Sequence, residues 1–420
     1  MAVVDSLIIF FTSKIIPYLG FFPYGEYLLN YHLPKFISSL ANFDGINYII
    51  IASQRYYQYE QAFFPFYPML IKILSPIFAN NHLLTGLIIS NLSFLLGLFI
   101  FVKYLEELLC HPELDSGSHL LKIRSRNEFG MTKKGFIFWT VVFFVTFPTS
   151  FFFGAVYTEG LFFFLAVSSL YFAKKERYML AGIFAFLASL TRLLGVFLII
   201  PFLFTLWPKR FKILKSYNPK VLLLLSPLLG FLTYSLYLFK TTGDPFFFLT
   251  AQPAFGAHRS AHLIFLPQVY FRYFKIFLTA SHNFQYFISL FEFLVFNLVF
   301  FVVILNLFAS LRSGIQDLIK IKQLPKPIFT KVTMGKQVRN DKKEFDYDRF
   351  GLGLFSLTNL VLPTLTGTFS SIPRYALLSL SFFIFMGEIK NTYLKVFFAV
   401  VFAVFHIVVL GYFAQGYFVS

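Results

Sequence analysis

Three carboxylates occupy positions where they can do acid–base chemistry, and Asp44 is the first of them. Only 19 of the 420 residues are Asp or Glu, so a carboxylate outside the charged connectors is unusual in this chain. Asp44 lies between Phe43 and Gly45 in a polar stretch, and an acid beside a flexible glycine is a candidate general base. Asp44 is also well placed to cap a helix that begins near Gly45, and chemistry alone favours that cap.

Glu60 and Glu159 are the other two carboxylates. Glu60 follows Tyr59 in the same polar stretch as Asp44. Glu159 follows Tyr157 at the point where one apolar run ends and the next begins. A helix N-terminus favours a carboxylate through its dipole, and this effect suffices to explain Glu159 taken singly.

Two arginines lie within or beside the apolar runs. Arg192 interrupts the apolar stretch 179–206, where a guanidinium needs an anionic partner such as a carboxylate or a phosphate. Two half-helices that turn near Arg192 and return to one side would accommodate this charge. Arg374, which precedes Tyr375, lies between two apolar runs, and extension toward lipid headgroups is the simpler explanation for it.

The composition places the chain in a membrane. It is 57% hydrophobic and 13% charged, whereas soluble domains carry about 25% charged residues. Too few charges remain to cover a water-soluble surface, so lipid is the expected solvent. The net charge of +17 does not indicate nucleic-acid binding, because Lys and Arg cluster in short connectors between apolar runs. We therefore expect an all-α, polytopic integral membrane bundle that forms one domain over residues 1–420.

Hydropathy predicts about ten transmembrane segments. Residues 3–22 and the interrupted stretch 179–206 are the weaker candidates. Clear spans are expected at 83–105, 136–155, 157–173, 221–239, 284–311, 351–370, 375–389 and 393–413. Residues 66–78 are apolar but short and broken by proline, so an interfacial or re-entrant segment is expected there.

Basic residues are concentrated in five connectors that are predicted to share the cytoplasmic side. These connectors are 107–135, 174–177, 207–220, 312–349 and 390–395, whereas 23–82 and 241–282 carry three basic residues each. The positive-inside rule makes 23–82 the first and 241–282 the second outer loop. This topology requires that 66–78 does not cross the bilayer and that 179–206 forms a hairpin.

Residues 111–131 differ from the rest of the chain. They are polar and non-periodic, and they resemble a translated bacterial interspersed repeat, which indicates a functionally idle insertion in a bacterial protein. Cys110 is the only cysteine, so a cysteine metal cluster is excluded. His258 and His262 have the spacing of a metal pair but lack an acidic third ligand nearby, so no metal site is predicted.

Taken together, these segments resemble the PIG-V mannosyltransferase family, a branch of the GT-C glycosyltransferases. The matching stretches are Phe43-Asp44-Gly45, where the family usually has Trp-Asp, then Tyr59-Glu60, Ala62 to Pro65 with Pro68, Pro148 to Glu159, Ala181-Gly182 to Thr191-Arg192, and Ser371 to Tyr375. Their order and spacing are preserved across nearly the whole chain. The resemblance implies a GT-C type helical bundle with a helical first outer loop.

The resemblance also implies a reaction and roles for individual residues. An inverting glycosyltransferase would move a sugar, mannose in the family, from a polyprenyl-phosphate carrier to an acceptor hydroxyl outside the cytoplasm. Asp44 would be the general base, and Arg192 and Arg374 would bind the donor phosphate. The residues implied to contact substrate are Tyr59, Glu60, Tyr157, Glu159 and Tyr375. No cofactor is implied, and a metal is optional because the donor carries one phosphate.

The same resemblance bounds the partners and the location. The acceptor would be a glycolipid, a glycan or a protein, and the location would be a bacterial plasma membrane with the active site on its outer side. A polytopic transporter of lipid-linked sugars is one alternative, but transporters place several ionisable groups at the midplane and show internal repeats, which this chain lacks. A polysaccharide ligase or polymerase is another, and it would rely on outer-loop residues such as Arg259 and His262.

Overall fold

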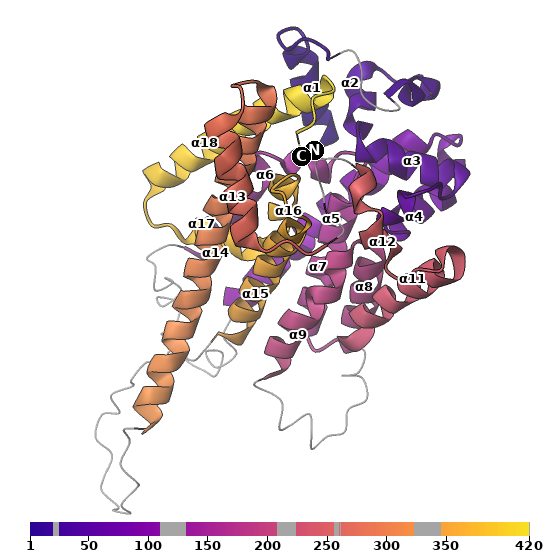
Figure 1. The fold of residues 1–420 in the computed structure, drawn as a ribbon. Helices are drawn as coiled ribbons and strands as arrows, with labels where there is room; N and C mark the ends of the chain where they lie inside the picture. The colour runs from indigo at the N-terminus through magenta and orange to yellow at the C-terminus, as the bar shows by residue number, and fades with distance from the viewer. Residues whose placement is uncertain are drawn as a thin grey trace, which may run out of the picture.

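The computed structural model describes residues 1–19, 25–109, 132–207, 224–255, 260, 262–322 and 346–419. Within these residues all regular structure is helical, and no strand occurs (Figure 1). This confirms the predicted all-α class. The predicted cytoplasmic stretches 111–131 and 320–349 lie wholly or largely outside the described residues.

The α-helices alternate with short 3₁₀ segments. They are α1 (Ala2–Thr12), α2 (Lys35–Ser38), α3 (Asp44–Gln54), α4 (Phe66–Leu74), α5 (His82–Leu109), α6 (Lys133–Thr146), α7 (Glu159–Lys174), α8 (Tyr178–Thr191), α9 (Ile199–Leu206), α11 (Ser226–Thr242), α12 (Phe247–Thr250), α13 (Leu266–Thr279), α14 (Phe284–Lys322), α15 (Tyr347–Val361), α16 (Ile372–Ala376), α17 (Leu380–Glu388) and α18 (Thr392–Ala414).

Three helices among the described residues are long and apolar enough to span a membrane. They cover His82–Leu109, Phe284–Leu311 and Thr392–Ala414. The remaining predicted spans correspond to shorter helices, so the expected count of about ten is not reproduced by long single helices. The helix predicted over 375–389, for example, contains only nine residues, Leu380–Glu388. A helix of that length covers about 14 Å, roughly half of a bilayer core.

Proline and polar residues explain why several predicted spans are shorter than expected. The helix predicted over 136–155 ends at Thr146, just before Pro148. The helix predicted over 351–370 ends at Val361, just before Pro363. A proline removes a backbone donor and disfavours helical geometry in the preceding residue, so a helix commonly ends there.

The stretch 179–206 is interrupted at Arg192. Helix α8 ends at Thr191, and Arg192 is extended, with φ −152° and ψ 146°. The chain then turns back on α8. A Cβ added to Gly195 would lie 2.5 Å from the backbone of Ala188 and Ser189, so only glycine allows this approach. The turn therefore places Arg192 at the end of a helical hairpin.

Helix α7 connects two ends of the molecule that differ in charge pattern. Its 16 residues, Glu159–Lys174, span about 24 Å. At its far end Lys174 pairs with Asp348, and Lys175 Nζ lies 2.6 Å from Glu107 Oε1. We call this end of the molecule, where Lys174 and Lys175 lie, the lysine end.

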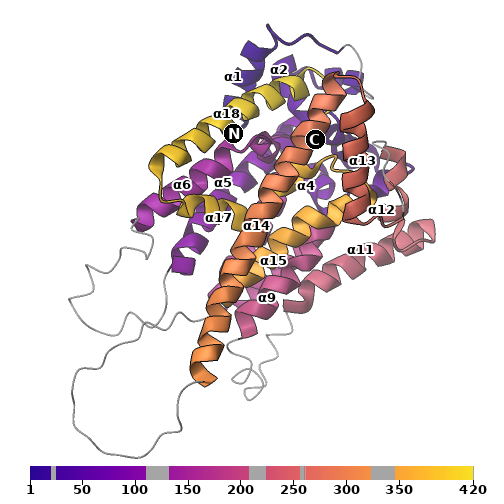
Figure 2. The same cartoon turned by 60° about the vertical axis from the view of Figure 1, so that its left-hand side comes forward.

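The lysine end also collects the boundaries of the basic connectors. Arg349 pairs there with Glu388, which joins the start of α15 to the end of α17. Figures 1 and 2 show α9 and the far end of α14 pointing away from α1 and α2, which lie at the opposite end. One described helix end from each of the five basic connectors thus lies at the lysine end, and Glu159 lies at the other end of α7.

Aromatic packing holds the long helices together between the two ends. Phe144 of α6 packs 4.7 Å from Phe163 of α7 and 4.9 Å from Phe153, measured between ring centroids. Phe94 of α5 stacks 4.7 Å from Phe153. Each of these rings is at most 2% exposed, so they form a dry core that fixes the start of α7.

Candidate active site

Asp44 is the first residue of α3, and its carboxylate contacts an arginine far away in the sequence. Arg374 Nη1 donates a hydrogen bond of 2.6 Å to Asp44 Oδ2. The residue that precedes the helix is Phe43, whose φ is +59°, and it makes no side-chain capping bond. Asp44 therefore does not act as the helix cap that chemistry alone favoured. Its side chain is directed to an ion pair.

Glu159 connects Arg374 to Arg192. Arg374 Nε lies 3.3 Å from Glu159 Oε1, and Arg192 Nη1 donates to the same carboxylate oxygen. Arg192 Nη1 also lies 3.2 Å from the Thr158 hydroxyl oxygen. The predicted need of Arg192 for an anionic partner is thus met by Glu159. Glu159 also opens α7, as its position in the sequence indicated.

Four side chains therefore form one continuous network, which we call the ion-pair cluster. Its members are Asp44, Glu159, Arg192 and Arg374. Two carboxylates and two guanidinium groups balance in formal charge. Such a balance is what allows charges to be buried, because an unpaired buried charge costs several kcal/mol.

Burial differs sharply among the members of the ion-pair cluster. Arg192 and Arg374 are 9% exposed as residues, and Glu159 is 1% exposed. The Asp44 side chain is 27% exposed. Asp44 is therefore the member of the cluster that a molecule arriving from outside can reach.

Aromatic rings surround the two guanidinium groups. Arg192 Cζ lies 4.9 Å from the ring centroid of Tyr375, and Arg374 Cζ lies 5.4 Å from that of Tyr157. The Tyr157 hydroxyl donates a 2.7 Å hydrogen bond to the backbone oxygen of Asn42. Two of the predicted substrate-contacting residues thus pack against the arginines, where cation–π attraction helps to hold the guanidinium groups in place.

Tyr48 belongs to the site although the sequence analysis did not single it out. It lies one helical turn after Asp44 on α3, and its ring centroid lies 6.4 Å from that of Tyr157. Burial raises the pKa of its hydroxyl, and the negative charges of Glu159 and Asp44 raise it further. Tyr48 could have been identified from the sequence by its spacing of four residues from Asp44, because residues four apart share a helix face.

Glu60 and Tyr59, by contrast, make their contacts within the loop and with α12. Glu60 Oε2 accepts a 2.8 Å hydrogen bond from the backbone N–H of Tyr57. Tyr59 stacks on Phe247, with ring centroids 6.2 Å apart. Within the described residues, neither side chain contacts the ion-pair cluster. The structure thus brings together six of the eight predicted site residues.

The residues considered for a ligase or for a metal pair are His258, Arg259 and His262. His262 is exposed, whereas His258 and Arg259 lie outside the described residues. Within the described ranges no group of three or more His, Cys, Asp or Glu side chains is arranged to hold a metal ion.

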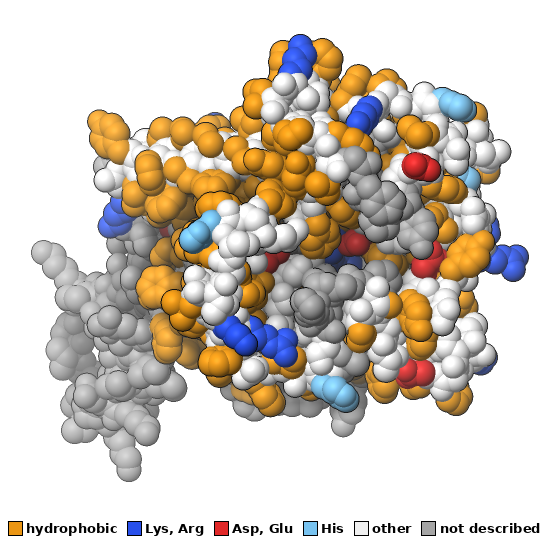
Figure 3. Space-filling view, turned by 45° about the horizontal axis from the view of Figure 1, so that its top comes forward, with side chains coloured by type: hydrophobic (Ala, Val, Ile, Leu, Met, Phe, Trp, Pro, Cys, Tyr) orange, Lys and Arg blue, Asp and Glu red, His pale blue; other side chains and the backbone are white. Residues whose placement is uncertain are grey.

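Seen from the end that carries α1 and α2, hydrophobic side chains gather on the left of the view, whereas the right side is largely polar with scattered charged side chains (Figure 3). A buried, charge-balanced cluster experiences weaker solvent screening than a surface ion pair does.

The fold gives this protein the character of a helical membrane protein. It is all-helical in its described residues, and three helices are long and apolar enough to cross a membrane. No protein family, curated protein or solved structure matches this chain.

Proposed function

We propose that this chain is a membrane glycosyltransferase of the GT-C type that acts outside the cytoplasm of a bacterium. It transfers a sugar, mannose on the family resemblance, from a polyprenyl-phosphate carrier to an acceptor hydroxyl. The observation that supports this proposal is the ion-pair cluster, in which a reachable carboxylate, Asp44, pairs with the buried guanidinium of Arg374, and Glu159 links Arg374 to the buried guanidinium of Arg192.

Asp44 is the general base in this reaction. It takes the proton of the acceptor hydroxyl while the acceptor oxygen forms a bond to the anomeric carbon of the sugar. The bond between that carbon and the phosphate oxygen breaks, and its electron pair stays on the phosphate. Attack opposite the departing phosphate inverts the anomeric centre.

Arg374 and Arg192 stabilise the lipid phosphate that leaves. Guanidinium groups match the geometry of phosphate, and they are most effective where water is excluded. Because the lipid phosphate departs as a stable anion, little acid assistance is required, and the step needs no bound cofactor.

The contact between Arg374 and Asp44 links donor binding to the activity of the base. In the ligand-free arrangement Arg374 donates to Asp44 Oδ2, so this carboxylate oxygen is already hydrogen-bonded. A donor phosphate competes for the same guanidinium. When Arg374 turns to the phosphate, Asp44 Oδ2 is released and can accept the acceptor hydroxyl, so deprotonation of an acceptor is favoured only with donor in place.

The arrangement of the two ends supports the proposed orientation. The ion-pair cluster lies about 24 Å along α7 from the lysine end, where the basic connectors begin and finish. With the lysine end in the cytoplasm, the positive-inside rule is satisfied and Asp44 faces outward.

The substitution Asp44→Asn tests this proposal. It keeps an oxygen that can accept from Arg374 but removes the basic carboxylate. Native membranes would be supplied with radiolabelled polyprenyl-phosphate-mannose, and transfer of label to membrane acceptors would be measured. We expect transfer to fall by about 1,000-fold or more while expression and donor binding persist.

Asp244→Asn is the matched control. Asp244 is an acid in the predicted second outer loop, where Oδ1 accepts a 2.8 Å hydrogen bond from the Phe246 backbone N–H. It lies outside the ion-pair cluster, so its substitution should leave transfer near the level of the unmodified chain. Undiminished transfer by the Asp44→Asn chain would refute the assignment of the base.

A further inference from the structure

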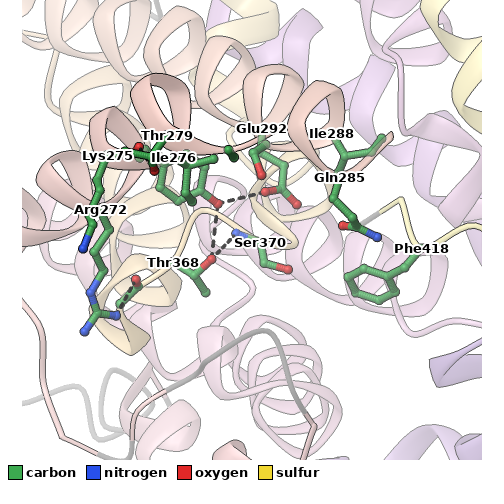
Figure 4. A pocket seen from close by; sticks show the side chains of 14 residues that line it. Arg272, Lys275, Ile276, Thr279, Gln285, Ile288, Glu292, Thr368, Ser370 and Phe418 are labelled. Atoms are coloured by element: carbon green, nitrogen blue, oxygen red, sulfur yellow. Dashed lines mark hydrogen bonds between the residues drawn. The ribbon is translucent and has the colours of Figure 1, made fainter. Parts of the chain in front are cut away.

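A large cavity lies between α13, α14 and the segment that leads to α16 (Figure 4). Its volume is about 830 Å³, which falls in the range of pockets that bind small molecules, about 300–1,000 Å³. The side chains that line it include two cations and a carboxylate among apolar neighbours. Neither the sequence analysis nor the proposed reaction assigns a role to this cavity.

A buried carboxylate forms part of its wall. Glu292 is 4% exposed, and its Oε2 accepts a 2.9 Å hydrogen bond from the Tyr273 hydroxyl. The Thr368 hydroxyl lies 3.2 Å from the same Tyr273 oxygen. Acids are rare in this protein, and one placed in a long apolar helix is costly unless it has polar partners. Carboxylate, phenol and hydroxyl groups together suit the recognition of a ligand with several hydroxyls.

Two cations line the cavity beside this polar wall. Arg272 and Lys275 come from the same helix, α13, and Figure 4 shows both side chains toward one end of the cavity, with Glu292 nearer its middle. Arg272 Nη1 donates a 3.0 Å hydrogen bond to the Gly367 oxygen. That contact uses one of five guanidinium N–H donors and fixes the side chain in position. The two positive charges suit a phosphate group.

The cavity adjoins the ion-pair cluster by two routes. Phe418 lines the cavity, and its ring lies 5.4 Å from that of Phe43, the residue before Asp44. Ser370, another lining residue, precedes Arg374 by four positions and belongs to the turn that opens α16. The ring of Phe418 therefore separates the cavity from the residue before the proposed base, and one turn of the chain separates it from the proposed phosphate-binding arginine.

We propose that this cavity binds the acceptor, and that the acceptor has an anionic headgroup rich in hydroxyls, as in a phosphate-bearing glycolipid. Its phosphate lies at Arg272 and Lys275, and its hydroxyls lie at Glu292, Tyr273 and Thr368. This inference rests on the proposed function, because it takes the donor phosphate to lie at Arg192 and Arg374. It narrows the acceptor from any glycan or protein to a lipid of one chemical class.

Binding of short-chain lipids to the purified full-length chain in detergent tests this proposal without turnover. Dihexanoyl phosphatidylglycerol carries a phosphate and two hydroxyls, dihexanoyl phosphatidic acid carries the phosphate alone, and octyl glucoside carries hydroxyls alone. We expect phosphatidylglycerol to bind most tightly. Lys275→Gln should weaken both phosphate lipids about tenfold, the cost of one charge-assisted hydrogen bond.

Further variants separate the two parts of the ligand. Glu292→Gln should weaken phosphatidylglycerol severalfold and leave phosphatidic acid unchanged. Lys240→Gln is the control, because Lys240 is an exposed cation on α11 that does not line the cavity. Equal binding of all three lipids, or binding unaffected by Lys275→Gln, would overturn the inference. So would displacement of phosphatidylglycerol by farnesyl phosphate, since the cavity would then be a donor site.

The inference and the proposed function can fail separately. Cavity-dependent lipid binding together with normal transfer by the Asp44→Asn chain would refute the proposed function alone. Loss of transfer in that chain, together with lipid binding that ignores Lys275 and Glu292, would refute the acceptor site alone.

Discussion

Arg374 Nη1 lies 2.6 Å from Asp44 Oδ2, and this contact joins residues 330 positions apart in the sequence. The same guanidinium places Nε 3.3 Å from Glu159. One arginine thus contacts both carboxylates of the cluster. A movement of Arg374 that alters its contact with Asp44 also alters its contact with Glu159. The proposed chemistry depends on this shared guanidinium.

Arg374→Lys should impair transfer severely although it keeps the positive charge. An ammonium is a point charge, so it cannot contact Asp44 and Glu159 in the directions that the planar guanidinium uses. We expect kcat/KM for the donor to fall by about 100-fold, the usual effect of losing one charge-stabilising donor. Arg55→Lys, at an exposed arginine, is the control. Transfer at the normal rate in the Arg374→Lys chain would return Arg374 to a packing role.

Glu159→Gln should destabilise the protein, because it leaves buried positive charge without compensation. Removing one partner of a buried ion pair typically costs about 3–5 kcal/mol. Adding Arg192→Gln restores formal neutrality, so the double variant should unfold at a higher temperature than the Glu159→Gln chain. Thermal unfolding in detergent of the unmodified chain, the two single variants and the double variant measures this coupling. Additive losses of stability would show that Glu159 and Arg192 do not act as a pair.

The two ends of α7 should lie on opposite sides of the membrane. With Cys110→Ser removing the only cysteine, single cysteines can be placed at Tyr57→Cys, in the predicted first outer loop that also holds Asp44, and at Lys175→Cys, at the lysine end. Tyr57 is 56% exposed. In intact cells a membrane-impermeant thiol reagent should label the first chain and spare the second until the cells are opened. The reverse pattern would place the proposed base in the cytoplasm and end the mechanism.

Glu60 should make stability depend on pH in the acidic range. Burial raises its pKa above the usual 4.5, although the Tyr57 N–H bond partly opposes this. The folded protein then holds the proton more tightly than the unfolded chain does. Stability therefore falls as pH rises from about 4.5 through the raised folded value. Melting temperatures from pH 4 to 7 should show less of this decline in Glu60→Gln, and identical profiles would contradict the prediction.

Several features of the site followed from the sequence, because they depend on local cost. A guanidinium within an apolar stretch requires an anion wherever it is placed, so Arg192 could be expected to have a partner and to interrupt its helix. Glu159 could likewise be placed at a helix start. The all-α class followed from a composition that only lipid tolerates.

The lengths of several helices, the contacts of Glu60 and Tyr59 and the cavity could not be predicted from neighbouring residues in the sequence. Hydropathy measures how apolar a stretch is but not where its helix ends, so several predicted spans contain helices too short to cross a bilayer alone. Glu60 and Tyr59 share the polar stretch with Asp44, yet their contacts are to Tyr57 and Phe247 rather than to the cluster. The cavity beside α13 combines residues that are ordinary when each is taken alone.

By itself the sequence determined that this chain needs lipid around it and that its few buried charges must be paired, since both follow from the free energy of hydrating each residue type. Only the tertiary structure decided which charges pair. Asp44, Glu159, Arg192 and Arg374 come from four separate segments. Packing of α3, α7, α8 and α16 sets the few ångströms within which a Coulombic contact and a hydrogen bond become strong, and no one-dimensional pattern encodes that distance.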